Sequence, residues 1–204
     1  LAGRLQLLER DAQNPESVAG HVAAAQAHIS TLLRTLDALL RLGEVEAGQR
    51  RVAFAPMDLS ELVEDIADSF QPLFEDADKQ LDVRAAPGVK LNGDRDLLTQ
   101  MISNLLENTL EYARDGAKAW MQLRVSERTA FLEVGDDGPG LPTHATESVF
   151  ERFVRLDSSR STPGNGLGLS LVRAIAELHN GKARVVATEP GAVFEVSLPR
   201  EEAQ

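Results

Sequence analysis

Three short stretches of sequence decide how this chain folds. Residues 104–108 read Asn-Leu-Leu-Glu-Asn, residues 136–140 read Asp-Asp-Gly-Pro-Gly, and residues 164–169 read Gly-Asn-Gly-Leu-Gly-Leu. Each stretch alone is weak evidence. In this order they predict two amides on a helix, an aspartate that leads into a glycine turn, and a glycine-rich loop that opens a second helix. This set of groups is typical of a pocket that holds a nucleotide.

The first stretch lies on an amphipathic helix that we expect over residues 94–113. Placing residues at 100° steps gives a buried arc of Leu98, Met101, Ile102, Leu105, Leu106, Thr109 and Ala113. Asn104, Asn108 and Glu111 gather at one edge of that arc. Both amides can therefore line one side of a pocket, because positions i and i+4 face the same way. Taken alone, the helix fits two ordinary surface asparagines equally well.

The other elements follow from apolar periodicity and turn residues. We expect a helix over residues 58–77, strands over 81–85 and 89–92, a hairpin of 119–126 with 129–134, a helix over 166–179, and strands over 182–188 and 192–198. Residues 137–165 are rich in Gly, Pro, Ser and Thr, and predict a long mobile loop in which only Phe150 and Phe153 anchor to an apolar surface. Helices and strands that mix without βαβ regularity predict an α+β fold, a two-layer sandwich.

The N-terminal quarter has a different pattern. An apolar seam with heptad spacing runs over residues 18–39, and a turn at residues 11–17 separates it from a shorter seam upstream. We expect residues 1–48 to form a helical hairpin, 49–57 a linker, and 58–204 the nucleotide domain. Two helices close a core poorly, so the hairpin is expected to form a homodimeric four-helix bundle.

Composition excludes several classes of function. The 204 residues include 21 basic and 32 acidic ones, for a net charge of −11, which argues against nucleic acid as a partner. No cysteine is present, so the chain has no disulfide and no thiol nucleophile. No apolar run approaches the ~18 residues that span a bilayer, so we expect no membrane contact by this chain.

The ordered motifs resemble the ATP-binding domain of bacterial two-component sensor histidine kinases, within the gyrase, Hsp90, histidine kinase and mismatch-repair ATPase superfamily. Residues 149–157, Val-Phe-Glu-Arg-Phe-Val-Arg-Leu-Asp, resemble the phenylalanine box of that family, and the resemblance covers essentially the whole chain. It implies that the pocket binds ATP with Mg²⁺ under a long ATP lid. It also implies that Asn108 holds the metal with Asn104 beside it, and that Asp136 accepts from the adenine amine.

The same resemblance assigns the remaining site residues. Those expected to contact the nucleotide are Tyr112, Gly138, Gly140, Arg155, Arg160, Gly164, Gly166, Leu167 and Gly168. The two arginines are expected to reach the phosphates, and the glycine-rich segment to offer them a helix N-terminus. One position departs from the family, since Glu111 stands where a basic residue is usual. We expect this carboxylate to turn away and pair with Arg114, Arg155 or Arg160.

The family phosphorylates a histidine in a His-Glu/Asp-x-Arg-x-Pro motif, and this sequence contains no such motif. Its four histidines are His21, His28, His144 and His179. His179 ends a predicted helix, where a cation is favourable. By resemblance, the chain begins about nine residues after the acceptor histidine, so no catalytic residue is assigned and the chain alone is not expected to phosphorylate itself.

The resemblance implies a cytoplasmic catalytic core of an inner-membrane sensor, which transfers the γ-phosphate of ATP to a histidine for relay to an aspartate of a response regulator receiver domain. Two alternatives remain open. A serine kinase of the anti-sigma class shares the pocket but lacks the hairpin and the phenylalanine box. A non-catalytic module would bind a partner through the hairpin and hold nucleotide weakly, and Glu111 favours it.

Overall fold

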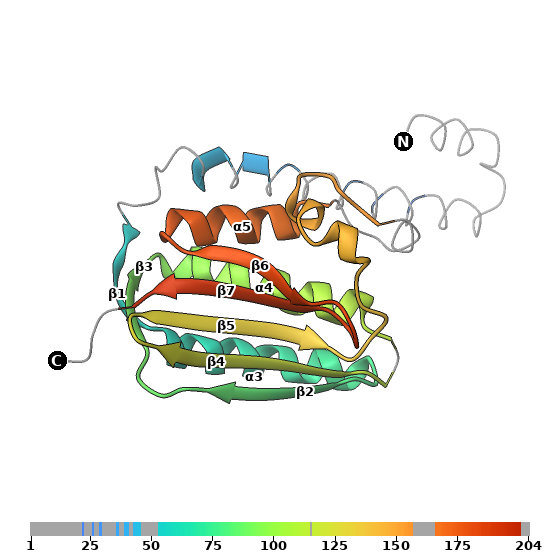
Figure 1. Ribbon diagram of the computed structural model, residues 1–204, viewed down its shortest axis with the longest axis horizontal. Coiled ribbons are helices and arrows are strands. Elements are labelled where there is room, and N and C mark those ends of the chain that lie inside the picture. Colours follow the sequence, from blue (N-terminus) through green and yellow to red (C-terminus); the bar gives the residue numbers. More distant parts are fainter. Residues whose placement is uncertain are drawn as a thin grey trace. The chain divides into compact units, whose positions relative to one another are not determined.

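A computed structural model describes residues 53–114, 116–156 and 166–200, together with residues 22, 26, 29, 36, 39, 40 and 43–45 (Figure 1). The chain divides into two compact units, Leu1–Arg41 and Leu42–Gln204. In the first unit the described residues are helical. They include Val22, Ile29, Leu36 and Leu39 of the predicted heptad seam, all exposed in the single chain. The rest of the predicted hairpin lies outside the described residues, and its dimerisation stays a prediction.

Three long helices are described in the second unit. They are α3 (Leu59–Asp76), α4 (Arg95–Tyr112) and α5 (Gly168–Leu178). Asp58 caps α3 by accepting the N–H groups of Ser60 and Glu61, and Asp94 caps α4 in the same way. An aspartate at this position satisfies N–H groups that the first turn leaves without partners. The helices predicted from periodicity are therefore confirmed, within a few residues of their expected ends.

The described strands form two sheets. In Figure 1 the strands of the larger sheet lie one below another, in front of the helices α3 and α4. The strands are β1 (Ala55–Asp58), β2 (Gln80–Ala85), β3 (Lys90–Gly93), β4 (Lys118–Ser126), β5 (Thr129–Asp136), β6 (Lys182–Ala187) and β7 (Val193–Pro199). The larger sheet has the order β2-β4-β5-β7-β6. It is mixed, because β2 runs parallel to β4 whereas all the other neighbouring strands of the sheet are antiparallel. The helices pack against one face, which confirms the α+β two-layer architecture.

The strand β1 was not expected. Its first three residues fall within the predicted linker, and it pairs antiparallel with β3 in a separate two-stranded sheet. Its sequence, Ala-Pro-Met-Asp, is short and contains a proline, which weakens any strand signal. Proline is tolerated in a strand at the edge of a sheet. The pairing with β3 is what makes this segment a strand.

The helix α4 lies at the centre of the core. All seven residues of the predicted buried arc are buried, and Leu98, Met101, Ile102, Leu105 and Leu106 are fully so. Burying a side chain of this size contributes about 1.5–3 kcal/mol. The packing fixes the rotation of α4, and this rotation places Asn104 and Asn108 at the margin of the core, where both are partly buried.

The start of α4 is held by a histidine from the end of α5. Nε2 of His179 accepts the backbone N–H of Asp94 at 3.1 Å, and Nδ1 donates to the carbonyl of Ile175 at 2.8 Å. The ring also stacks on Phe54, with 4.4 Å between centroids. A nitrogen that accepts carries no proton, so the ring is neutral in this arrangement. The expected cation at this helix end is therefore wrong, because the ring is buried and serves as an acceptor.

The predicted mobile loop contains ordered turns in its first half. Two short 3₁₀ helices, η2 (Thr143–Ala145) and η3 (Ser148–Phe150), follow Gly140. Residues 157–165 lie outside the described residues, and the expected disorder without nucleotide stays a prediction.

One of the two expected anchors of this loop is confirmed. Phe150 is buried, meets Phe194 edge-on at 6.2 Å, and has the guanidinium of Arg173 above its ring. Phe153 is 58% exposed, so its expected anchoring is wrong. Its backbone has a positive φ, and its N–H donates to the carbonyl of Gly166, so Phe153 serves the turn and not the core.

Candidate functional site

Asp136 is the best-defined group of the candidate site. It is the last residue of β5 and is only 6% exposed. Its Oδ1 accepts the N–H of Gly138 at 2.7 Å, and its own backbone N–H donates to the carbonyl of Ala192. Burial raises the pKa of the Asp136 carboxyl above its ordinary value, and the neighbouring charge of Asp137 adds to this. A buried carboxylate that can accept further hydrogen bonds suits a donor such as an exocyclic amine.

Glycines bring the backbone close around this carboxylate. A Cβ at Gly138 would lie 2.5 Å from Oδ1 of Asp136, and a Cβ at Gly140 would lie 2.0 Å from the carbonyl oxygen of Thr188. Gly140 has a positive φ, whereas Gly138 does not. A glycine is needed at position 138 only because the backbone there passes close to the carboxylate of Asp136.

Sequence reasoning missed two neighbours of Asp136. A Cβ at Gly191 would lie 1.7 Å from the carbonyl oxygen of Asp136, so the β6–β7 turn closes over the end of β5. The only signal in the sequence is the Glu189-Pro190-Gly191 turn between two predicted strands. Lys79 is buried, donates to the carbonyl of Leu110 on α4, and lowers the pKa of Asp136 slightly. No motif marks this lysine.

The first asparagine of α4 faces the start of α5. A Cβ at Gly168 would lie 3.7 Å from Oδ1 of Asn104, which is ordinary van der Waals contact. The side-chain Nδ2 of Asn104 is buried and has no hydrogen-bond partner among the described residues, and the same holds for Oγ1 of Thr109. Leaving a buried donor without a partner costs ~1–3 kcal/mol. The buried amide of Asn104, at the margin of the core, therefore fits a polar ligand.

The helix α5 begins in a way that suits an anion. No described side chain caps its first turn, which starts at Gly168 after Leu167, and Gly166 has the positive φ that turns the chain into the helix. The first N–H groups of any α-helix have no partner within the helix. A Cβ at Gly166 would lie 2.9 Å from the backbone of Phe153, so the glycine is required for this close approach.

Some of the other predicted site residues are described by the structure, and some are not. Tyr112, the last residue of α4, and Arg155 are partly buried. Glu111 is exposed, and its neighbour Arg114 pairs with Asp137 at 3.5 Å. Arg160 and Gly164 lie outside the described residues. The expected turning of Glu111 towards an arginine stays a prediction.

The donors around Asn108 also bear on a metal site. Among the described residues no three His, Cys, Asp or Glu side chains gather closely enough to hold a metal ion. Asn108 offers one amide oxygen, from a partly buried position. Mg²⁺ is commonly bound by few protein ligands and completes its shell with phosphates and water. The residues present therefore fit a magnesium ion carried by a nucleotide, and not a dedicated protein cage.

Comparison with known proteins agrees with this geometry. Residues 93–202 match the family model described as histidine kinase-, DNA gyrase B- and HSP90-like ATPase, and the chain belongs to this family. Within it, the chain is a catalytic domain of the two-component sensor histidine kinase class.

Two relatives of this class illustrate the match. The chain is 32% identical to the signal transduction histidine-protein kinase BaeS of Escherichia coli strain K12, over 98% of the chain and 43% of BaeS. It is also 32% identical to the probable sensor histidine kinase TcrY of Mycobacterium tuberculosis, over 98% of the chain and 42% of TcrY. The chain thus spans less than half the length of these relatives.

Solved structures show the same fold. The mycobacterial sensor histidine kinase MprB is 28% identical with a TM-score of 0.64, over 74% of this chain and 99% of that one. The histidine kinase AdeS of Acinetobacter baumannii matches at a TM-score of 0.79 over 98% of this chain and 93% of that one, and at 22% identity this likeness concerns the fold alone. Among the described residues of our chain, no helix is both long enough and apolar enough to cross a membrane.

Proposed function

We propose that this chain binds ATP with Mg²⁺ and presents the γ-phosphate for transfer to a histidine, from which it passes to an aspartate of a response regulator. The observation that carries the proposal is the buried Asp136, held at the end of β5 by glycines and raised in pKa by its burial. A hydrogen-bond donor stabilises the ionised form of a buried carboxylate, and the exocyclic amine of adenine is such a donor.

The phosphates would lie between α4 and α5. Asn104 lies close to Gly168, so the asparagine helix faces the first turn of α5, which no described side chain caps. In this proposal the N–H groups of that turn, with Arg155 and Arg160, hold the phosphate oxygens, and Asn108 orients the metal. When bound, Mg²⁺ neutralises charge on the phosphates. The protein itself positions the reactants and shields them from water.

The sequence contains no His-Glu/Asp-x-Arg-x-Pro motif, so the proposal assigns no acceptor histidine among these residues. We therefore propose that the chain supplies the ATP-binding half of the reaction and that the homodimer formed through the helical hairpin brings it to the acceptor. We place this activity in the cytoplasm, at the inner face of a membrane-anchored sensor.

Isothermal titration with a non-hydrolysable ATP analogue tests the first step. We expect binding that strengthens when Mg²⁺ is added, and Asn108→Asp should alter the dependence on Mg²⁺ because it changes the charge of the ligand group. Asn92→Asp is the matched control, since Asn92 is an exposed residue of β3. Equal binding by the native protein with and without Mg²⁺ would remove the metal from the proposal.

A non-catalytic interaction module remains the second candidate function, and Glu111 is the residue that favours it. A carboxylate on the same helix as the two asparagines opposes phosphate. The absence of any heat of binding with either ADP or the ATP analogue, at millimolar concentration, would favour this candidate over the kinase.

A further inference from the structure

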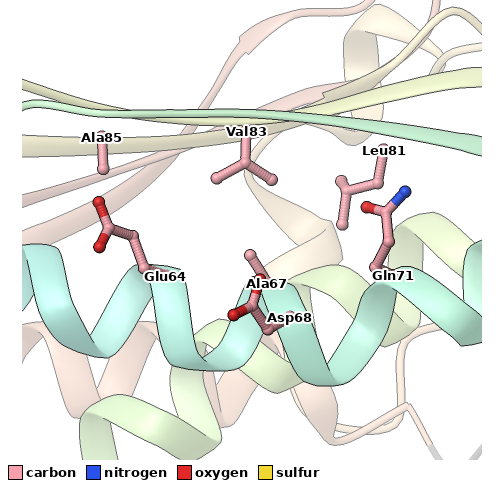
Figure 2. Close-up of a pocket in the computed structure, with 7 residues that line it drawn as sticks. All are labelled: Glu64, Ala67, Asp68, Gln71, Leu81, Val83 and Ala85. Atoms are coloured by element: carbon pink, nitrogen blue, oxygen red, sulfur yellow. The ribbon is translucent and has the colours of Figure 1, made fainter.

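A cavity lies at the end of the helix layer opposite α5, between α3 and the edge strand β2 (Figure 2). Its volume is about 380 Å³. The side chains of Leu81, Val83 and Ala85 point from β2 towards α3 and form an apolar wall with Ala67. The α3 side of the cavity carries polar groups from Glu64, Asp68 and Gln71. None of these residues belongs to the nucleotide site.

The backbone of β2 is open on the side away from β4. The strand is at the edge of the five-stranded sheet, and no described strand pairs with its other side. The N–H of Gln80 donates to Ala117, and the N–H of Ala86 donates to Leu123, so the even-numbered residues bond towards β4. Alternate residues of a strand direct their backbone groups to opposite sides. Leu81, Val83 and Ala85 therefore offer their N–H and C=O groups to the open edge.

The charge at this cavity has one sign. Glu64 and Asp68 are four residues apart on α3, so they share one face of the helix, and both are exposed. Neither has an ion-pair partner among the described residues. The basic residue of β2, Arg84, pairs with Asp82 at 2.8 Å. These two carboxylates, which have no ion-pair partner in the described part of the chain, lie above an apolar wall. They are complementary to long basic side chains, whose methylene stems are apolar and whose heads are charged.

We propose that the groove between α3 and β2 binds an extended basic segment of a partner protein. The segment adds an antiparallel strand to β2, through the backbone groups of Leu81, Val83 and Ala85. Its inward-facing Arg or Lys side chains lie along the apolar wall and reach Glu64 and Asp68. Strand addition at an open edge supplies affinity through the backbone, and the side chains that enter the groove supply specificity.

Charge argues against a second copy of this chain as the occupant. Pairing two β2 strands about a twofold axis would bring a second α3, with its own Glu64 and Asp68, to the same edge. Four carboxylates without basic partners would then share one interface, and like charges brought together oppose association. A basic partner neutralises the carboxylates instead.

The test uses an acetylated and amidated eight-residue peptide that alternates Arg and Thr, with amide hydrogen exchange and fluorescence anisotropy as readouts. In an antiparallel pair, residues directly opposite each other place their side chains on the same face. Arg residues that face inward therefore pair with Leu81, Val83 and Ala85. We expect these three amides to gain protection from exchange. Methylation of the backbone nitrogens of the Arg residues should abolish binding, because these N–H groups face β2. Methylation of the backbone nitrogens of the Thr residues, which face away, should leave binding nearly unchanged.

Charge-reversal variants complete the test. The double change Glu64→Lys with Asp68→Lys should weaken peptide binding by roughly tenfold or more, because it reverses the sign of the groove. Glu177→Lys, the same change at an exposed position of α5, should alter binding less than about twofold. A folded double variant, shown by unchanged binding of the ATP analogue, keeps the comparison valid.

Three results would overturn the proposal. They are equal binding of a Glu-Thr peptide, protection that appears away from β2, and self-association of the chain that competes with the peptide. Nucleotide binding is measured separately, so failure here leaves the proposed kinase function standing.

Discussion

Oδ1 of Asp136 accepts the backbone N–H of Gly138 at 2.7 Å, and a Cβ on that glycine would lie 2.5 Å from the same oxygen. The carboxylate and the turn are therefore fitted to each other. The aspartate holds the turn through a hydrogen bond, and the glycine leaves the space that the carboxylate occupies. Any side chain at position 138 must displace the Asp136 carboxylate, which we propose accepts a hydrogen bond from the adenine amine.

Gly138→Ala should weaken binding of the ATP analogue by about ten- to a hundredfold, because a displaced hydrogen bond to a charged group is worth ~1.5–3 kcal/mol. The position has no positive φ, so the new methyl group acts through the contact with Asp136. Gly43→Ala is the matched control, since nothing lies within 4 Å of a Cβ there. Titration calorimetry on both variants measures the difference, and equal affinities would show that the carboxylate does not contact the nucleotide.

Asp136→Asn should weaken nucleotide binding and stabilise the protein without nucleotide. Burial raises the pKa of Asp136 above its ordinary value of 3.8, so the native state holds this proton more tightly than the unfolded chain. The stability that this contributes is present below pH 3.8 and is lost as the pH rises through the native pKa. Asparagine does not ionise, so the variant gains stability over the native protein across that same range.

Urea denaturation at several pH values between 4 and 8 measures this effect. The difference in the free energy of unfolding between the variant and the native protein should grow with pH and then level off. A difference that stays constant over the whole range would mean that Asp136 titrates as it does in the unfolded chain. Asn92→Asp, at an exposed position, controls for a general change of charge.

Much of this fold could be predicted because its periodic signals agree with its tertiary packing. The arc on α4 is an example: Leu98, Met101 and Ile102 recur with helical spacing, and the structure buries all three. Asp58 and Asp94 are helix caps that can be read from sequence, because a short side-chain acceptor precedes an apolar helix. These elements depend on local chemistry, so local sequence is enough to find them.

The rest depends on contacts between distant residues. Lys79 donates a hydrogen bond to Leu110, which is 31 positions away, and Gly191 packs beside the distant residue Asp136. Neither contact leaves a local pattern in the sequence. The strand β1 exists through its pairing with β3. Phe153 carries the same apolar side chain as Phe150, yet only a backbone turn formed with Gly166 decides that it is exposed.

Glu111→Lys should raise the affinity for the ATP analogue less than tenfold. Glu111 is exposed at the end of α4, where a long side chain can turn away from the ligand at little cost, since surface ion pairs are worth ~0–1 kcal/mol. Calorimetry at two ionic strengths separates a direct contact from a screened one. A gain above tenfold would show that the native carboxylate opposes the phosphates and would favour the weakly binding module.

Arg124→Ala should destabilise the protein by about 1–3 kcal/mol. Arg124 bonds both Glu133 at 2.9 Å and Glu195 at 2.5 Å, and these two glutamates stand directly opposite each other on β5 and β7. The side chain of Glu195 is only 3% exposed. Removing the arginine leaves two like charges side by side, one of them buried, with Arg184 as the remaining partner of Glu195.

The control for this prediction is Arg84→Ala on the edge strand β2. Its pair with Asp82 is 2.8 Å long, but both side chains are more than half exposed. An exposed pair contributes ~0–1 kcal/mol, so the control should unfold at nearly the native urea concentration. Raising the salt concentration should shift the control little and leave most of the Arg124→Ala deficit in place, because water and ions reach Glu195 poorly. Equal midpoints for the two variants would mean that the ion pairs of Arg124 with Glu133 and Glu195 add no stability.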